Sequence, residues 1–143
     1  MNLKDLKVVF AGCAKNCEKF LPTVLENINI YSSLFYETYT VIVENGSADK
    51  TKEILKKNKN QRNIFLFRDD LNKFSYRCER LENARNLIIK TIKKDPKLAD
   101  CDLLIMLDLD DIGAYKIDDK DILDSINFLF SIEKSAGVFP NQQ

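Results

Sequence analysis

The chain has 143 residues, of which 45% are hydrophobic and 31% charged, and these proportions predict one globular domain with a packed core. Its 22 basic and 22 acidic side chains cancel, so the positive charge excess typical of proteins that bind nucleic acid is missing. The longest uncharged apolar run, Leu103 to Leu107, is far too short to span a bilayer. We therefore expect neither a nucleic-acid partner nor a membrane span.

The composition also limits the chemistry. The chain has no histidine, which excludes His-based zinc sites, Ser–His and Cys–His nucleophile pairs and imidazole acid–base catalysis. We expect the cysteines to be free thiols, because a domain of this size does not need disulfides; they are Cys13, Cys17, Cys78 and Cys101. The segment from Met1 to Lys7 lacks the apolar stretch and cleavage site of a secretory signal, so we expect a cytoplasmic protein.

Strands and helices are predicted to alternate along the chain. Short β-branched and aromatic runs predict strands at Lys7–Ala11 (closed by Gly12), Tyr39–Glu44 (closed by Asn45-Gly46), Asn63–Phe67, Asp102–Leu107 and, weakly, Ala136–Phe139. Helical spacing predicts one helix that begins near Pro22, with Asn16 as candidate cap, and others at about 49–58, around Leu81 to Ile92, and at about 120–132. This alternation predicts an α/β fold with a Rossmann-like, mainly parallel sheet flanked by helices.

The residues that follow each strand are the candidate site. Ligands of such sheets bind beyond the carboxyl ends of the strands, where the strand order reverses. Polar residues are concentrated at those positions, in the segments 12–16, 44–49, 68–70 and 108–111. We therefore expect these segments to meet at one edge of the sheet.

The segment LLIMLDLDD delivers three carboxylates, Asp108, Asp110 and Asp111, to the end of a buried strand. Like charges held close together repel, so such a cluster at the edge of an apolar core favours a bound cation. With only oxygen ligands available, the expected ion is Mg²⁺ or Mn²⁺, its coordination completed by substrate phosphates. In the alternative interpretation, Asp110 and Asp111 only cap the turn into Ile112-Gly113.

Two further segments are informative. ENGSADKT, residues 44–51, is typical of a tight Asn-Gly turn that leads from a strand into a helix capped by Ser47 or Asp49. YRCERLENARN, residues 76–86, places Arg77, Arg80 and Arg85 on the first turns of a helix. Arginines at this spacing fit a diphosphate clamp or, equally, a helix surface with Arg–Glu pairs.

Three other protein classes are excluded by the positions of these motifs. Receiver domains carry an acidic pair after their first strand, and haloacid-dehalogenase-type phosphatases carry an aspartate pair there, where this chain has only Gly12–Asn16. P-loop nucleotidases need a glycine-rich loop that ends in Gly-Lys-Ser or Gly-Lys-Thr, and the sequence has none.

Taken in order, the three segments resemble the nucleotide-sugar-binding half of the glycosyltransferase A fold. ENGSADKT is similar to the acidic-Asn/Asp-Gly-Ser-x-Asp-x-Thr loop of family-two-like enzymes, ERLENARN to their Ala-Arg-Asn helix, and MLDLDD to their Asp-x-Asp signature. Within that group, Arg77, Arg80-Leu81 and Arg85-Asn86, with the closing VFPNQ at 138–142, look most like the capsule-associated mannosyltransferase family. The resemblance spans about Val8 to Gln142.

The resemblance implies a metal-dependent transfer of a sugar from a nucleotide-diphosphate donor to a hydroxyl acceptor. It implies that Glu44 and the loop after the first strand contact base and ribose, that Arg85 positions the diphosphate, and that Asp108 faces the ribose. The nucleotide-sugar-binding residues expected on this basis are Ala11, Gly12, Cys13, Lys15, Glu44, Asn45, Ser47, Arg77, Arg85, Asp108 and Leu109. The expected ligands of Mn²⁺ or Mg²⁺ are Asp110 and Asp111.

We expect residues 1–143 to form a single donor-nucleotide-binding domain, the amino-terminal part of a catalytic domain whose acceptor-binding strands and catalytic base would follow Gln143. The expected partners are a nucleotide-diphosphate sugar and a glycan or protein acceptor. Two alternatives remain: a non-catalytic module that kept the donor pocket and lost transfer, and a nucleotidyltransferase, which shares metal–carboxylate chemistry.

Overall fold

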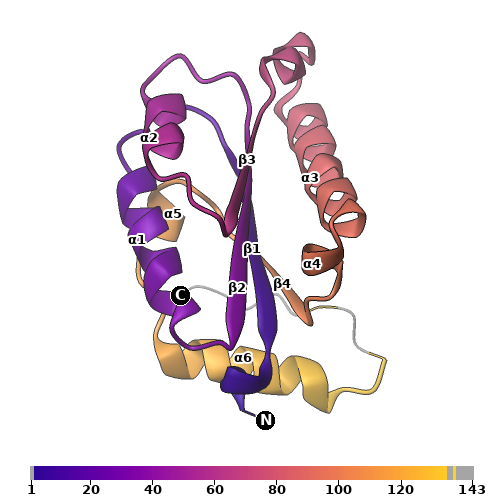
Figure 1. Ribbon diagram of the computed structural model, residues 1–143. Helices are drawn as coiled ribbons and strands as arrows, with labels where there is room; N and C mark the ends of the chain where they lie inside the picture. Colours follow the sequence, from indigo (N-terminus) through magenta and orange to yellow (C-terminus); the bar gives the residue numbers. More distant parts are fainter. Residues whose placement is uncertain (1, 135–136, 138–143) are drawn as a thin grey trace.

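One parallel sheet lies between two layers of helices in the computed structural model, which describes residues 2–134 and 137 (Figure 1). The strands are β1 (Lys7–Ala14), β2 (Glu37–Glu44), β3 (Asn63–Phe67) and β4 (Leu103–Met106), in the order β3-β2-β1-β4. The α-helices are α1 (Leu21–Ser32), α2 (Thr51–Lys57), α3 (Arg77–Lys94), α4 (Pro96–Ala99), α5 (Asp111–Ala114) and α6 (Asp119–Ser131). Two short 3₁₀ helices are η1 (Leu3–Asp5) and η2 (Asp69–Lys73). The predicted Rossmann-like parallel α/β fold is confirmed.

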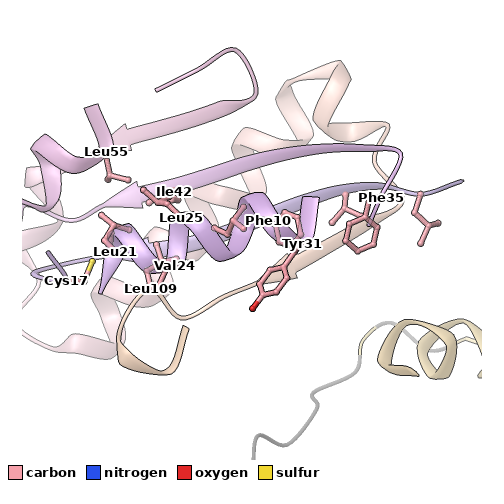
Figure 2. Packing of buried hydrophobic residues seen from close by; sticks show 14 of the residues in the cluster. Phe10, Cys17, Leu21, Val24, Leu25, Tyr31, Phe35, Ile42, Leu55 and Leu109 are labelled. Carbon is pink, nitrogen blue, oxygen red and sulfur yellow. The ribbon is translucent and has the colours of Figure 1, made fainter. Parts of the chain in front are cut away.

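The two faces of the sheet carry separate hydrophobic clusters, because successive strand residues point to opposite sides. On the face covered by α1 and α2, Phe10 and Ile42 pack with Leu21, Val24 and other apolar residues (Figure 2). On the opposite face, Val9, Ala11, Val41 and Val43 pack against Ala84 and Ile88 of α3. The central strands β1 and β2 are therefore buried on both sides, and this explains their nearly continuous apolar sequences.

The helix α6 lies across the amino ends of the strands, whereas the loops that follow β1, β2 and β3 lie at the opposite edge (Figure 1). Ile126 of α6 belongs to the α1-side cluster, and Ile122 packs against it. Within residues 2–134 and 137, no helix combines the length and the apolar composition that crossing a bilayer requires.

Several predicted boundaries agree with the structure. β3 has the predicted bounds, α1 starts at Leu21 with Pro22 in its first turn, and α3 ends at Lys94, directly before Asp95-Pro96. All four cysteines are free, as predicted. The predicted strand at 136–139 lies outside the described residues apart from Gly137, which belongs to no strand.

Two predictions about the first loop are wrong. Gly12 does not close β1, because the strand continues to Ala14 and pairs along its whole length with β2. Gly12 instead allows a close approach: a Cβ atom there would lie 2.7 Å from the Leu107 carbonyl oxygen and 2.8 Å from Leu109 Cγ. Asn16 does not cap α1, because the N-cap of that helix is Phe20. The side chain of Asn16 instead accepts the N–H of Ala48 at 2.8 Å.

The close approach at Gly12 predicts the effect of a single added methyl group. Gly12→Ala should lower the free energy of unfolding by about 1–3 kcal/mol, because the segment after β4 must move away from β1. Urea denaturation measures the change, with Lys90→Ala on the exposed surface of α3 as a control expected to stay within about 0.5 kcal/mol of wild type. Equal stability of Gly12→Ala and wild type would show that this approach is not tight.

Candidate functional site

The strand order reverses between β1 and β4, because β2 and β3 lie on one side of β1 and β4 on the other. In open parallel sheets the crevice at the carboxyl ends beside such a reversal is the usual ligand site. Here that edge is formed by the residues after β1, by the turn after β2, by the segment after β4, and by the first turns of α3. The segment 68–70 joins this edge where the Arg68 N–H donates to the Glu44 carbonyl at 2.8 Å. The predicted segments therefore lie at the carboxyl ends of the strands, except that Gly12, Cys13 and Ala14 belong to β1 and Glu44 to β2.

The turn after β2 is organised by the carboxylate of Glu44, which is fully buried. Glu44 Oε2 accepts the backbone N–H of Gly46 at 3.1 Å, and Oε1 accepts that of Ser47 at 2.6 Å. Gly46 adopts φ +59°, the left-handed conformation that glycine tolerates, so the predicted Asn-Gly turn is present. Each oxygen of Glu44 thus accepts one N–H of its own turn, and the side chain has no exposed surface, whereas the predicted contact with base or ribose requires access to it.

The loops after β1 and β2 are fastened to each other by reciprocal hydrogen bonds. Ser47 Oγ accepts the N–H of Asn16 at 2.9 Å, while Asn16 Oδ1 accepts the N–H of Ala48. One residue further along, Asp49 Oδ2 accepts the N–H of Glu18 at 3.1 Å, while Glu18 Oε2 accepts the N–H of Lys50 at 2.9 Å. These four bonds hold the two loops in one register.

The remaining polar residue of the motif completes this fastening from the buried side. Thr51 is fully buried, and its Oγ1 accepts the N–H of Cys17 at 3.0 Å. Asp49 Oδ1 accepts the N–H of Thr51 at 2.9 Å, although the N-cap of α2 is Lys50. The predicted helix cap by Ser47 or Asp49 is therefore wrong, although Asp49 does accept the N–H of the first residue of α2. The Ser, Asp and Thr of the motif serve mainly to join the loops.

Asn45 differs from its neighbours because its side chain is buried without a partner. The residue is 7% exposed, and its Oδ1 accepts no hydrogen bond from any described residue. Its backbone N–H donates to the Ala14 carbonyl at 2.9 Å, and this bond closes the ladder between β1 and β2 at the pair Ala14–Glu44. Asn45 therefore lies directly beyond the carboxyl end of β2, beside the end of β1. An unpaired buried oxygen costs about 1–3 kcal/mol, which a donor from a ligand would offset.

Cys13 packs on the α3 face of the sheet, and the charges of Arg85 and Asp108 both act on its thiol. Burial raises the pKa of the Cys13 thiol above its ordinary value; the positive charge of Arg85 opposes this rise, and the negative charge of Asp108 adds to it. Both charges therefore lie close enough to act on one thiol, although they come from α3 and from the segment after β4. Arg85 is exposed and forms none of the salt bridges of the described chain. Its guanidinium is available to an anion.

The other two arginines of the α3 segment have different environments. Arg80 Nη1 donates to the carbonyl oxygens of Phe74 at 2.7 Å and Ser75 at 3.1 Å, so it holds the chain that enters α3. Arg77 is exposed at the first residue of the helix. The alternative of Arg–Glu pairs is not observed, because no salt bridge in residues 2–134 involves α3.

The acidic segment does not form a ready-made metal centre. In the part of the chain that the structure describes, no three His, Cys, Asp or Glu side chains are grouped as metal ligands. Asp110 is the N-cap of α5, and its Oδ1 and that of Asp111 accept the same N–H, that of Ile112, at 3.2 and 3.1 Å. This is the geometry of the capping alternative. Both carboxylates are exposed, and each retains a second oxygen.

The remaining predicted contacts are less accessible or already engaged. Ala11 and Leu109 are buried, at 2% and 3% exposed, and Leu109 packs against Gly12. Lys15 Nζ donates to Asn72 Oδ1, and Asn72 Nδ2 donates to the Gly46 carbonyl at 3.2 Å, so η2 is joined to both loops. Sequence reasoning missed Asn72, which belongs to no recognisable motif.

Comparisons with known proteins do not assign the chain to a family. A scan against protein-family models finds no match, and neither do searches of curated proteins and of solved structures. The resemblance to glycosyltransferases therefore remains a prediction, and the site geometry is the basis on which a function is proposed.

The cluster of Cys13, Arg85 and Asp108 predicts how the thiol titrates. The alkylation rate of Cys13 follows its thiolate fraction, so Arg85→Ala should move the pH midpoint of alkylation upward and Asp108→Asn should move it downward. Peptide mapping by mass spectrometry after timed iodoacetamide treatment isolates Cys13 from the other thiols. Lys90→Ala, on the exposed surface of α3, should leave the midpoint unchanged. Identical midpoints in all four proteins would mean that these charges do not meet at Cys13.

Proposed function

We propose that the carboxyl edge of the sheet binds a nucleotide-diphosphate sugar and serves as the donor site of a metal-dependent glycosyltransferase. The observation that carries this proposal is the buried, unpartnered Oδ1 of Asn45 at an edge that also carries an unpaired arginine. Nucleobases and ribose offer N–H and O–H donors, and a diphosphate offers the anionic oxygens that a guanidinium binds. One ligand class therefore supplies both missing partners.

Asn45, Arg85 and Asp108 each have a distinct role in this proposal. Asn45 Oδ1 accepts a hydrogen bond from the base or the ribose, which removes the cost of its burial. Arg85 binds the diphosphate through charge-assisted hydrogen bonds. Asp108, an exposed carboxylate, accepts a ribose hydroxyl. Glu44 and the fastened loops hold Asn45 in place before the ligand arrives, which reduces the entropy lost on binding.

The acidic pair fits a divalent metal that binds together with the nucleotide. Mg²⁺ usually takes only one or two protein carboxylates and completes its coordination with water and substrate phosphates, so a grouping of three protein ligands is not required. Asp110 and Asp111 offer two exposed carboxylates whose oxygens converge on one N–H. When bound there, the ion would neutralise the negative charge that develops on the departing diphosphate.

The role of Asn45 predicts opposite effects on binding and on stability. Asn45→Ala should weaken nucleoside-diphosphate binding about tenfold or more, because it removes the acceptor, yet it should not lower the melting temperature of the free protein, because the unpaired oxygen is lost too. Thermal shifts with UDP, GDP, CDP and dTDP, each with and without Mn²⁺, identify the best nucleotide, and calorimetry then compares the variants. Asn29→Ala, an exposed asparagine on α1, is the matched control. A nucleotide that binds Asn45→Ala and wild type equally would contradict the proposal.

The acidic pair predicts a loss of metal dependence rather than a loss of fold. Replacing Asp110 and Asp111 together by asparagine should abolish the Mn²⁺-dependent part of nucleotide binding, since amide oxygens carry no charge to hold the ion. Calorimetry with and without Mn²⁺ measures it, and replacing Asp121 and Asp124 of α6 together by asparagine controls for the same change in net charge. Slow Mn²⁺-dependent hydrolysis of a sugar nucleotide by wild type would favour an enzyme over a binding module. Unchanged Mn²⁺ dependence in the double variant would refute the metal assignment.

A further inference from the structure

The segment from Asp108 to Ile117 carries the acidic residues, and it is attached to the rest of the fold by two buried polar side chains of α1. These side chains are Asn27, 6% exposed, and Tyr31, 2% exposed. Neither belongs to any motif of the sequence, and each is 86 or 87 residues away in the chain from the atoms that it binds. Figure 1 shows α5 lying beside α1.

Asn27 binds the carboxyl end of α5. Its Nδ2 donates to the carbonyl oxygens of Gly113 at 3.3 Å and Ala114 at 3.1 Å. Carbonyls at the end of a helix have no partner within the helix, so this amide satisfies groups that α5 leaves free. Asp110 and Asp111 cap the opposite end of the same helix. The helix that positions the two carboxylates is thus held at its far end by α1.

Tyr31 binds the chain where it leaves α5. Its hydroxyl oxygen accepts the N–H of Ile117 at 2.7 Å, while its ring packs with Phe10 in the α1-side cluster, with ring centroids 6.3 Å apart. Figure 2 shows the ring among the cluster residues and the hydroxyl oxygen directed away from them. The hydroxyl can therefore be removed without removing the packing of the ring.

Gly113 connects this anchored helix to Asp108. A Cβ atom at Gly113 would lie 1.8 Å from the Asp108 carbonyl oxygen and 3.4 Å from Val24 of α1, so the segment folds back on itself with no room for a side chain. A shift of α5 on α1 therefore also moves the backbone of Asp108. These contacts connect α1 to both Asp108 and the pair Asp110 and Asp111.

We infer that Asn27 and Tyr31 are positioning residues: they fix the acidic segment so that Asp110 and Asp111 meet the metal and the diphosphate in one geometry. This inference rests on the proposed function. Neither residue contacts the ligand, and both act through the backbone of α5 and Ile117. Outer partners that orient metal ligands typically change metal affinity by about 10- to 100-fold when they are mutated.

The most direct test removes one oxygen atom. Tyr31→Phe should lower the Mn²⁺ enhancement of nucleotide binding, defined as the ratio of Kd without Mn²⁺ to Kd with Mn²⁺, by about tenfold, while the Kd without Mn²⁺ stays within about twofold of wild type. Calorimetry with UDP, GDP, CDP and dTDP measures both constants.

In the absence of any ligand, the segment 110–117 of Tyr31→Phe should exchange its amide hydrogens for deuterium faster than the same segment of wild type. Asn27→Ala is a second variant, with the same expected pattern.

The matched control is Tyr39→Phe, which also removes one tyrosine hydroxyl. Tyr39 lies near the amino end of β2, and its hydroxyl donates to Glu37 Oε1 at 2.7 Å, remote from the acidic segment. This variant should keep the wild-type Mn²⁺ enhancement and the wild-type exchange rates in the segment 110–117.

The outcomes separate this inference from the proposed function. If wild type shows no Mn²⁺ enhancement with any of the four nucleotides, the proposed metal-dependent function fails, and the positioning role fails with it. If wild type shows the enhancement and Tyr31→Phe retains it in full, only the positioning role is overturned. An equal loss of affinity with and without Mn²⁺ would also overturn it, because a merely structural residue acts on both constants alike.

Discussion

The hydrogen bonds that the buried side chain of Glu44 accepts organise the turn after β2 and, through it, the carboxyl edge of the sheet. A carboxyl group without any exposure is tolerated only when hydrogen-bond partners face it, and here the donors are the N–H groups of Gly46 and Ser47. Those bonds close the turn on the left-handed Gly46, and the closed turn presents Ser47 to Asn16 of the neighbouring loop. The first loop is held to this turn by that bond and by Cys17, which is buried and donates its N–H to Thr51.

The edge thereby divides its polar residues into two groups. The first group joins the backbone of one loop to that of the other and has little capacity left for a ligand; its members are Asn16, Glu18, Ser47, Asp49 and Thr51. The second group has unused hydrogen-bonding capacity and comes from the turn after β2, from α3 and from the segment after β4; its members are Asn45, Arg85 and Asp108. A rigid frame with a few unsatisfied groups is the arrangement expected of a preorganised binding site.

The parts of the fold that local sequence determines were predictable. The turn at Asn45-Gly46, the start of α1 near Pro22 and the end of α3 before Pro96 all follow from residues that restrict the backbone at or next to their own position. The bounds of β3 follow from its short apolar sequence, NIFLF, which has polar residues on both sides. The parallel sheet follows from the alternation of strands and helices, which is also a pattern along the chain.

The parts that depend on distant contacts were not predictable in the same way. Gly12 is compatible with a turn, and only the approach of Leu109 explains why it lies inside a strand. Asn16 is a good helix cap by residue type, but the turn after β2 offers it a different partner, Ala48. The aspartates at 110 and 111 suit a cap or a metal ligand equally, and their attachment to α1 through Asn27 has no signal in the sequence.

The central claim is that the unsatisfied groups at the carboxyl edge bind one nucleoside diphosphate, and backbone NMR tests it most directly. ¹⁵N-labelled protein in Mg²⁺ would be titrated with UDP, GDP, CDP and dTDP in turn. The account predicts that at least one nucleotide shifts the amide signals of Cys13, Asn45 and Arg85 together, while those of Lys7 and Glu37, at the amino ends of β1 and β2, stay in place. Shifts confined to the amino ends, or no shifts with any of the four nucleotides, would contradict it.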